Sequence, residues 1–152
     1  MGCKYALPYI RRNKGAIINI GSVVALTAGV GCVGYSCAKG AIEAFTRALA
    51  MEEARNGVRV NEVKPGHINS AIYKQLVKEK GTKSKYCQFM DNVQILGRGG
   101  EPEEIAYTAL FLASDWSSFI TGTQILATGG YELGEAEKQP YQFISWPDPI
   151  IK

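Results

Sequence analysis

A serine, a tyrosine and a lysine stand at spacings that could support proton transfer. Ser22 follows a short apolar run, Tyr35 comes thirteen residues later, and Lys39 lies four residues beyond the tyrosine. Because helical residues four apart share a face, the phenol and the ammonium are expected to project side by side. An ammonium held near a phenol favours the phenolate, so such a phenol can exchange a proton with an alcohol or carbonyl oxygen. The hydroxyl of Ser22 could hydrogen-bond that same oxygen and stabilise its developing charge.

The elements around these residues are expected to alternate between helix and strand. Residues 2–13 predict the last turns of a helix, and the apolar run Ala16–Ile20, between two glycines, is typical of a strand buried on both faces of a parallel sheet. The glycine-containing residues 21–34 are expected to form a loop at the carboxyl end of that strand. A helix is predicted from Tyr35 to about Arg55, and its sheet-facing stripe is expected to be Ala38, Ile42, Phe45 and Leu49.

The rest of the chain continues the alternation. Residues 58–63 predict a second strand, a short amphipathic helix is expected around Ile72 and Val77, and residues 78–85 are read as a charged, solvated loop. Pro102 and its acidic neighbours predict a helix whose buried face is expected to be Ile105, Ala109, Leu112 and Ala113. Residues 123–127 predict a third strand. This order indicates half of a doubly wound α/β sheet, a partial domain over residues 1–134 followed by an extended tail over 135–152.

Composition indicates an ordinary globular protein. Hydrophobic residues make up 46% of the chain and charged residues 20%, and the net charge of +3 is too small and scattered to indicate a nucleic-acid or membrane partner. No apolar run has the length of a membrane span, so a cytoplasmic or similarly reducing location is expected. The cysteines, with one histidine in the chain, have no metal-ligand spacing, so we expect no metal site and four reduced thiols: Cys3, Cys32, Cys37 and Cys87.

Five segments carry a resemblance to a known family. The sequence resembles the C-terminal portion of the short-chain dehydrogenases/reductases, nicotinamide-dependent oxidoreductases with a Rossmann fold. The matching segments are GAIINIGS, YSCAKGAIEAFTRALAMEE, GVRVNEVKPG, LGRGGEPEEIAYTALFLASD and FITGTQILATGG. The resemblance implies that Ser22 is the catalytic serine, that Tyr35 is the general acid and base, and that Lys39 is its electrostatic partner and holds the nicotinamide ribose. It also implies a cofactor, NAD or NADP, and a small-molecule alcohol or carbonyl substrate.

The same resemblance assigns residues after the second strand. Pro65 and Gly66 would pass the nicotinamide ring, Ile68 would offer backbone contacts to its carboxamide, and Ser70 stands where the family commonly has threonine. The segments LPYIRRNKGAIINIGS and ILATGGYELG resemble the 17-beta-hydroxysteroid dehydrogenase type 14 group, whose members have been linked to L-fucose oxidation. That implies a secondary alcohol on a steroid or sugar, in a pocket lined by His67, Ile72, Tyr73 and Leu76. The alternatives are core packing of a lid helix for the last three, and a merely polar loop residue for His67.

The sequence also departs from the family pattern. It contains no Gly-x-x-x-Gly-x-Gly turn and no Asn-Asn-Ala-Gly, so the N-terminal dinucleotide-binding half and the residues that choose between NAD and NADP are lacking. Gly21 stands where serine is usual, and Cys37 where alanine is common. The strand Ala16–Ile20 would then expose an unpaired edge. We therefore expect this chain alone to bind dinucleotide poorly and to aggregate.

Two functions remain open from the sequence. The first is an NAD(P)-dependent alcohol dehydrogenase or carbonyl reductase, a homo-oligomer in its full-length form, which as a truncated chain could be inactive. The second is a non-catalytic remnant of the same family that acts through subunit association. The small residues on the helix that carries Tyr35 would permit such packing: Gly40, Ala41, Ala44 and Ala48.

Overall fold

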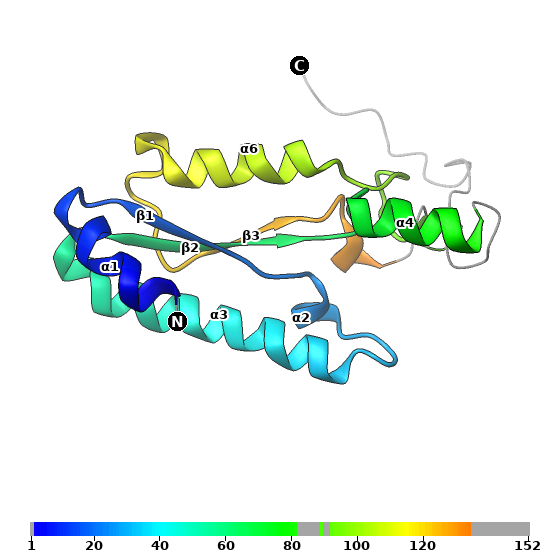
Figure 1. Cartoon of the computed structure of the whole chain (residues 1–152), viewed down its shortest axis with the longest axis horizontal. Coiled ribbons are helices and arrows are strands. Elements are labelled where there is room, and N and C mark those ends of the chain that lie inside the picture. The colour runs from blue at the N-terminus through cyan, green and yellow to red at the C-terminus, as the bar shows by residue number, and fades with distance from the viewer. Residues whose placement is uncertain (1, 82–88, 90–91, 135–152) are drawn as a thin grey trace, which may run out of the picture.

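A three-stranded parallel sheet lies between two helices in the computed structural model, which describes residues 2–81, 89 and 92–134 (Figure 1). The strands β1 (Ala16–Ile20), β2 (Arg59–Pro65) and β3 (Gln124–Ala127) are ordered β1-β2-β3. Helix α3 (Val33–Glu53) covers one face and α6 (Pro102–Ala113) covers the other. This arrangement confirms the predicted mixed fold and its parallel sheet.

The described core is small and centres on the middle strand. Residues 60–64 of β2 are buried, and Val60 packs with Leu49, Ala50 and Val58 in one apolar cluster. Helix α1 (Gly2–Arg12) closes this cluster through Cys3, Leu7 and Ile10. Arg11 fixes α1 to α3, because its guanidinium donates to both carboxylate oxygens of Glu53, at 2.7 and 2.5 Å.

The predicted sheet-facing stripe of α3 is wrong in part. Its buried residues are Thr46, Leu49, Ala50 and Glu53, whereas Ala38 and Phe45 are exposed. Polar pairs account for the difference. The side-chain amide of Asn19 on β1 donates to the Thr46 hydroxyl at 2.9 Å, and the Glu53 carboxylate accepts hydrogen bonds from the Arg11 guanidinium. These partners satisfy polar groups in the interface, so α3 presents a mixed face to the sheet instead of its most apolar one.

Two shorter helices flank the carboxyl end of the sheet. Residues 21–34 were expected to form only a loop, but they include a single helical turn, α2 (Val24–Thr27), and α3 begins at Val33. Helix α4 (Ala71–Lys80) matches the predicted amphipathic helix and includes the first three residues of the predicted charged loop. Short 3-10 turns follow α3, α6 and β3, at Ala54–Asn56, Asp115–Ser117 and Tyr131–Leu133.

Helix α6 is held at both ends. Glu101 and Glu104 form a reciprocal capping box at its N-terminus. Near its C-terminus the Arg59 guanidinium, from β2, donates to the carbonyls of Leu112 and Ser114 at 2.7 and 3.0 Å. Leu112 is fully buried as predicted, whereas Ala113 is exposed because it lies at the last position of the helix.

Strand β1 is an edge of the sheet in the described part of the chain. It pairs only with β2 there, and Ile20 at its carboxyl end is 45% exposed. This confirms the predicted unpaired edge. Cys3, Cys32 and Cys37 are free thiols, whereas Cys87, residues 82–85 and the predicted tail lie outside the described residues. Among the helices of the described segments, none combines the length and apolarity needed to cross a bilayer.

Candidate functional site

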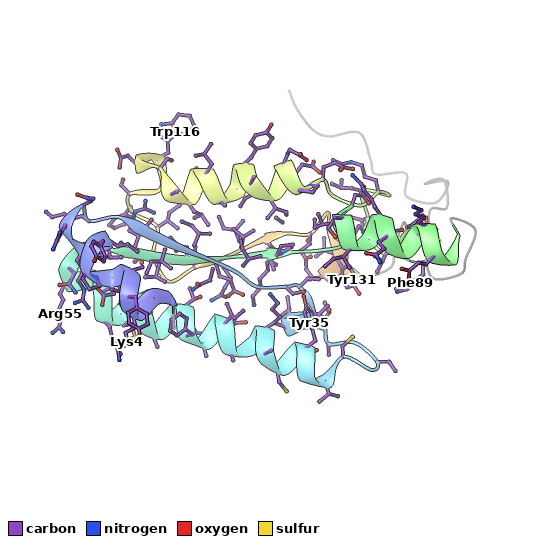
Figure 2. All side chains as sticks on the ribbon, viewed as in Figure 1. Lys4, Tyr35, Arg55, Phe89, Trp116 and Tyr131 are labelled. Atoms are coloured by element: carbon purple, nitrogen blue, oxygen red, sulfur yellow. The ribbon has the colours of Figure 1, made fainter. Side chains whose placement is uncertain are left out.

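An open pocket of about 380 Å³ lies at the carboxyl ends of β1 and β2. Eight of its lining residues come from the sequence prediction: Ser22, Tyr35, Gly66, His67, Ile68, Ser70, Ile72 and Tyr73. Figure 2 shows Tyr35 at this end of the molecule, away from Arg55 at the other end of α3. Parallel α/β sheets bind ligands at this edge, so the pocket is where a site of this architecture is expected.

Ser22 is fixed by an extension of the β1–β2 pairing. The amide of Gly21 donates to the Val63 carbonyl at 2.8 Å, and the amide of Val23 donates to the Pro65 carbonyl at 3.0 Å. Ser22 lies between these two bonds and is 8% exposed. Its Oγ accepts a hydrogen bond from the Val24 amide at 3.3 Å, which leaves its own O–H available to donate into the pocket.

Tyr35 and Lys39 lie on one face of α3, as their spacing predicts. The Lys39 Nζ is 5.7 Å from the centroid of the Tyr35 ring, and the phenol is half exposed. The same ammonium donates to the Ile20 carbonyl at 3.0 Å. Lys39 is therefore anchored to the end of β1 at the border of the pocket, with its charge beside the phenol ring.

The loop after β2 has no room for a side chain at Gly66. A Cβ there would lie 2.2 Å from the Gln94 Oε1 and 2.7 Å from the Thr128 carbonyl. That same Oε1 accepts the His67 amide at 2.7 Å. Pro65, the last residue of β2, does not line the pocket, but its carbonyl accepts a hydrogen bond from the Val23 amide.

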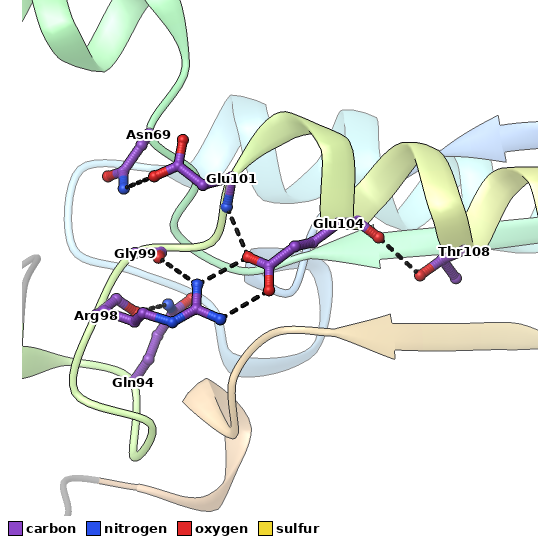
Figure 3. A network of polar contacts seen from close by, with 7 residues as sticks. All are labelled: Asn69, Gln94, Arg98, Gly99, Glu101, Glu104 and Thr108. Carbon is purple, nitrogen blue, oxygen red and sulfur yellow. Dashed lines mark hydrogen bonds and ion pairs between the residues drawn. The ribbon is translucent and has the colours of Figure 1, made fainter.

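A polar network holds this loop to the start of α6 (Figure 3). The Gln94 Nε2 donates to the Arg98 carbonyl at 2.6 Å, and the Arg98 guanidinium donates to both Glu104 carboxylate oxygens at 2.8 and 2.7 Å. The bonds from Arg98, and a further one from the Glu101 amide, lower the pKa of Glu104 to about 2. Asn69, just beyond the loop, donates to the Glu101 carboxylate at 2.7 Å. The network therefore ties the loop after β2, which lines the pocket, to the start of α6.

The α4 side of the pocket is built on Ser70. Its Oγ caps the helix by accepting the Tyr73 amide at 3.4 Å, and the Tyr73 ring meets the His67 ring edge-on, with centroids 4.1 Å apart. His67 is buried and lines the pocket. Ile72 is 83% exposed, which contradicts core packing for that residue. Leu76 belongs to α4, but its side chain lies outside the described part.

Tyr131 is a pocket residue that the sequence interpretation missed. It follows Gly129 and Gly130 at the carboxyl end of β3, and it lines both this pocket and a neighbouring one of about 280 Å³ (Figure 2). Its position was a usable signal, because the carboxyl ends of parallel strands gather at one edge of the sheet.

The chain is similar to known oxidoreductases over nearly its whole length. A family model described as Enoyl-(Acyl carrier protein) reductase matches residues 1–132. L-fucose dehydrogenase of Bos taurus is 42% identical over 135 residues, which cover 89% of this chain and 50% of that protein. The 3-oxoacyl-(acyl-carrier-protein) reductase FabG of Chlamydia trachomatis is 42% identical over 123 residues, 81% of this chain and 47% of the relative.

Solved structures agree with these relatives. An NADPH-bound short chain oxidoreductase from Pseudomonas aeruginosa superposes with a TM-score of 0.77 at 29% identity and covers 84% of this chain and 50% of that one. A short chain dehydrogenase/reductase from Burkholderia thailandensis gives a TM-score of 0.78 at 30% identity, with coverages of 88% and 51%.

The chain spans about half the length of the curated relatives it matches. Since the family model covers all but the last part of the sequence, the chain belongs to the short-chain dehydrogenase/reductase family.

Proposed function

We propose that this chain supplies the reacting end of an NAD(P)-dependent oxidoreductase, which transfers a hydride between nicotinamide and a secondary alcohol or its carbonyl. The observation that carries the proposal is the pocket that holds Ser22 and Tyr35, with the Lys39 ammonium 5.7 Å from the phenol ring. It sits at the edge where parallel sheets bind their ligands.

The pocket fits the nicotinamide end of a dinucleotide in size and in its donors. Its volume is within the range of small-molecule sites. Tyr35 and Lys39 would hold the ribose, Pro65-Gly66 and Ile68 would border the ring, and the Ser70 hydroxyl, which accepts the Tyr73 amide, keeps its proton to donate. The sequence has no Gly-x-x-x-Gly-x-Gly turn for the pyrophosphate, so the adenosine end finds no such partner in this chain. When bound, the nicotinamide supplies the hydride donor or acceptor.

Each of the three residues has a separate task in this proposal. The Tyr35 phenol exchanges a proton with the substrate oxygen. The Ser22 O–H donates to the same oxygen, because its Oγ already accepts the Val24 amide and its proton therefore points elsewhere. The Lys39 ammonium, held by the Ile20 carbonyl, stabilises negative charge on the phenol oxygen during the transfer.

We favour a hydroxyl group of a sugar as the reacting alcohol within this proposal. Several relatives are named for secondary alcohols or ketones, among them the L-fucose dehydrogenases and a meso-2,3-butanediol dehydrogenase of Serratia marcescens. Three tyrosines line the pocket, Tyr35, Tyr73 and Tyr131, and they offer both ring faces and hydroxyls to a polyhydroxylated ring. The steroid half of the sequence prediction stays a prediction, as does the choice between NAD and NADP.

The two halves of the dinucleotide, used as separate ligands, test the proposal on the chain itself. Ligand-observed NMR should detect binding of reduced nicotinamide mononucleotide, and no binding of ADP, because only the nicotinamide end has its residues here. The Tyr35→Ala variant should lose the nicotinamide mononucleotide signal, whereas Tyr107→Ala, an exposed tyrosine on α6, should keep it. Equal signals from Tyr35→Ala and wild type would refute the assigned site, and tight ADP binding would refute the division between the two ends.

A second candidate is subunit association without catalysis. Helix α3 exposes apolar side chains along its length: Val33 at 75%, Phe45 at 45% and Met51 at 83%. Exposed apolar surface of this kind supports an interface with another chain. Sedimentation of the Phe45→Glu/Met51→Glu variant tests it, and an unchanged mass distribution relative to wild type would refute it.

A further inference from the structure

Glu62 fills the space that a side chain at position 21 would need. It lies on β2, opposite Asn19 of β1, and is fully buried. A Cβ built on Gly21 would lie 1.8 Å from the Glu62 Oε1 and 2.8 Å from its Cδ. The Glu62 carboxyl therefore fits only because position 21 is glycine.

This contact places a carboxyl beside the residue that follows the anchor of Lys39. Gly21 follows Ile20, whose carbonyl accepts the Lys39 Nζ at 3.0 Å, and precedes Ser22 in the pocket wall. Glu62 packs against Gly21 from the face of β2 that also carries Val60 and Lys64, which contact α3. The carboxyl lies behind the pocket and lines no part of it.

The charges around Glu62 are incompletely paired. On α3, Glu43 accepts both Arg47 and the buried Lys64 of β2. Neither carboxyl oxygen of Glu62 has a hydrogen bond within the described residues, and the Lys39 ammonium donates to a backbone carbonyl, that of Ile20. With both carboxyls ionised, three cations face two anions, and Lys39 is the cation without a carboxylate.

Within the described residues, the strands paired with β2 place no further charge opposite Glu62. Its register partners are Asn19 on β1, whose amide bonds Thr46, and Gln124 on β3. Burial raises the pKa of Glu62, as does the Glu43 carboxylate, while Lys64, Arg47 and Lys39 oppose the rise. Glu62 therefore loses its proton at a higher pH than an ordinary glutamate does. The charge that it then gains interacts with the Lys39 ammonium.

We propose that Glu62 is a positioning residue for Lys39: its carboxyl, admitted by the missing side chain of Gly21, governs how firmly the ammonium stays at the Ile20 carbonyl beside Tyr35. The ionised carboxylate attracts the ammonium toward the end of β1. The protonated acid withdraws that attraction, and Lys39 then leaves its anchor more often. The inference rests on the proposed function only for the task that it gives Lys39.

Lysine labelling tests the proposal without cofactor or turnover. The full chain is pulsed with acetic anhydride from about pH 5 to about pH 9, a range that brackets a raised glutamate pKa. Mass spectrometry gives the labelling rate of Lys39 relative to the exposed Lys4. The relative rate should fall roughly threefold or more as Glu62 ionises. Glu62→Gln, which keeps the volume and removes the charge, should make the profile flat, whereas Glu52→Gln, an exposed glutamate on α3, should preserve it.

Two results would overturn the proposal: a flat profile in wild type, or the same falling profile in Glu62→Gln. Gly21→Ala gives an independent check, because its Cβ would displace the carboxyl while the charge stays in the chain, and it too should lose the profile. Since no step needs a dinucleotide, a chain that fails to bind nicotinamide mononucleotide but keeps the wild-type profile would refute the proposed function and leave this inference standing.

Discussion

The packing of Glu62 on Gly21 predicts a stability coupling between the two positions. In Gly21→Ala the new Cβ would lie 1.8 Å from the Glu62 Oε1, whereas ordinary contact begins near 3.4 Å. The carboxyl would have to move by roughly 1.6 Å, the difference between these two distances. It is fully buried between the sheet and α3, so the movement must disturb its neighbours.

Overpacking of this kind costs about 1–3 kcal/mol in buried sites. We therefore expect Gly21→Ala to lower the free energy of unfolding by about 2 kcal/mol in the wild-type background. In a Glu62→Ala background the clashing atoms are absent, so the same substitution should cost little. The coupling between the two positions is then about 1–3 kcal/mol, in the range seen for residues in contact.

Urea unfolding followed by circular dichroism measures all four free energies of this cycle. Gly40→Ala is the matched control, because it lies within α3 and a Cβ there meets nothing within 4 Å. It should be neutral or slightly stabilising, since alanine favours a helix over glycine. If Gly21→Ala costs the same with and without Glu62, the contact has no energetic weight and the reasoning is wrong.

Three further predictions concern the supports of the site. Arg59→Lys should lower the free energy of unfolding, measured in urea, by about 2 kcal/mol. The lysine ammonium cannot replace the hydrogen bonds that the Arg59 guanidinium donates to Leu112, Ser114 and Ser117, so full stability would contradict this prediction. Arg11 lowers the pKa of Glu53, so the stability from this pair is present above the unfolded value near pH 4.3 and lost as pH falls through the lower folded value. Glu53→Gln should flatten that acid limb of pH-dependent urea unfolding, and an unchanged limb would count against the pair. Arg98→Met should raise the pKa of Glu104 from about 2 toward that of a free glutamate, as measured by carboxyl NMR; no change would show that Arg98 is not the cause.

Local sequence signals predicted the elements well where glycine or proline marks their ends. Ala16–Ile20 was predicted with its observed bounds, because glycines border a continuous apolar run. Pro102 and the glutamates around it predicted the start of α6 for the reason seen in its capping box. The turn α2 was missed, since four residues among glycines carry too little periodicity to indicate a helix.

Long-range polar pairing could not be predicted. The buried face of α3 is decided by Thr46 with Asn19 and by Glu53 with Arg11, and these partners meet only once the sheet and α1 are in place. Apolar periodicity alone therefore favoured Ala38 and Phe45. The role of Gly21 was hidden for the same reason, because its contact with Glu62 depends on the register of β1 against β2.

The candidate site was predicted better than its surroundings. Ser22 and Tyr35 could be placed together because a strand end and a helix start bring them to one edge. Tyr131 comes from a third strand end, nearly a hundred residues away from Tyr35, and no local motif joins the two.

Turnover that depends on Tyr35 tests the central claim most directly. The chain covers 50% of the bovine L-fucose dehydrogenase and should be fused behind the dinucleotide-binding part of that relative. In a fusion that circular dichroism shows to be folded, NADH or NADPH formation with L-fucose should fall at least about 100-fold in Tyr35→Phe, the size of a general acid–base contribution. Tyr107→Phe should retain the unmodified rate, because that phenol lies on α6, outside the pocket. Equal turnover by the Tyr35→Phe and unmodified fusions would contradict the assignment of this pocket as the reacting end of a dehydrogenase.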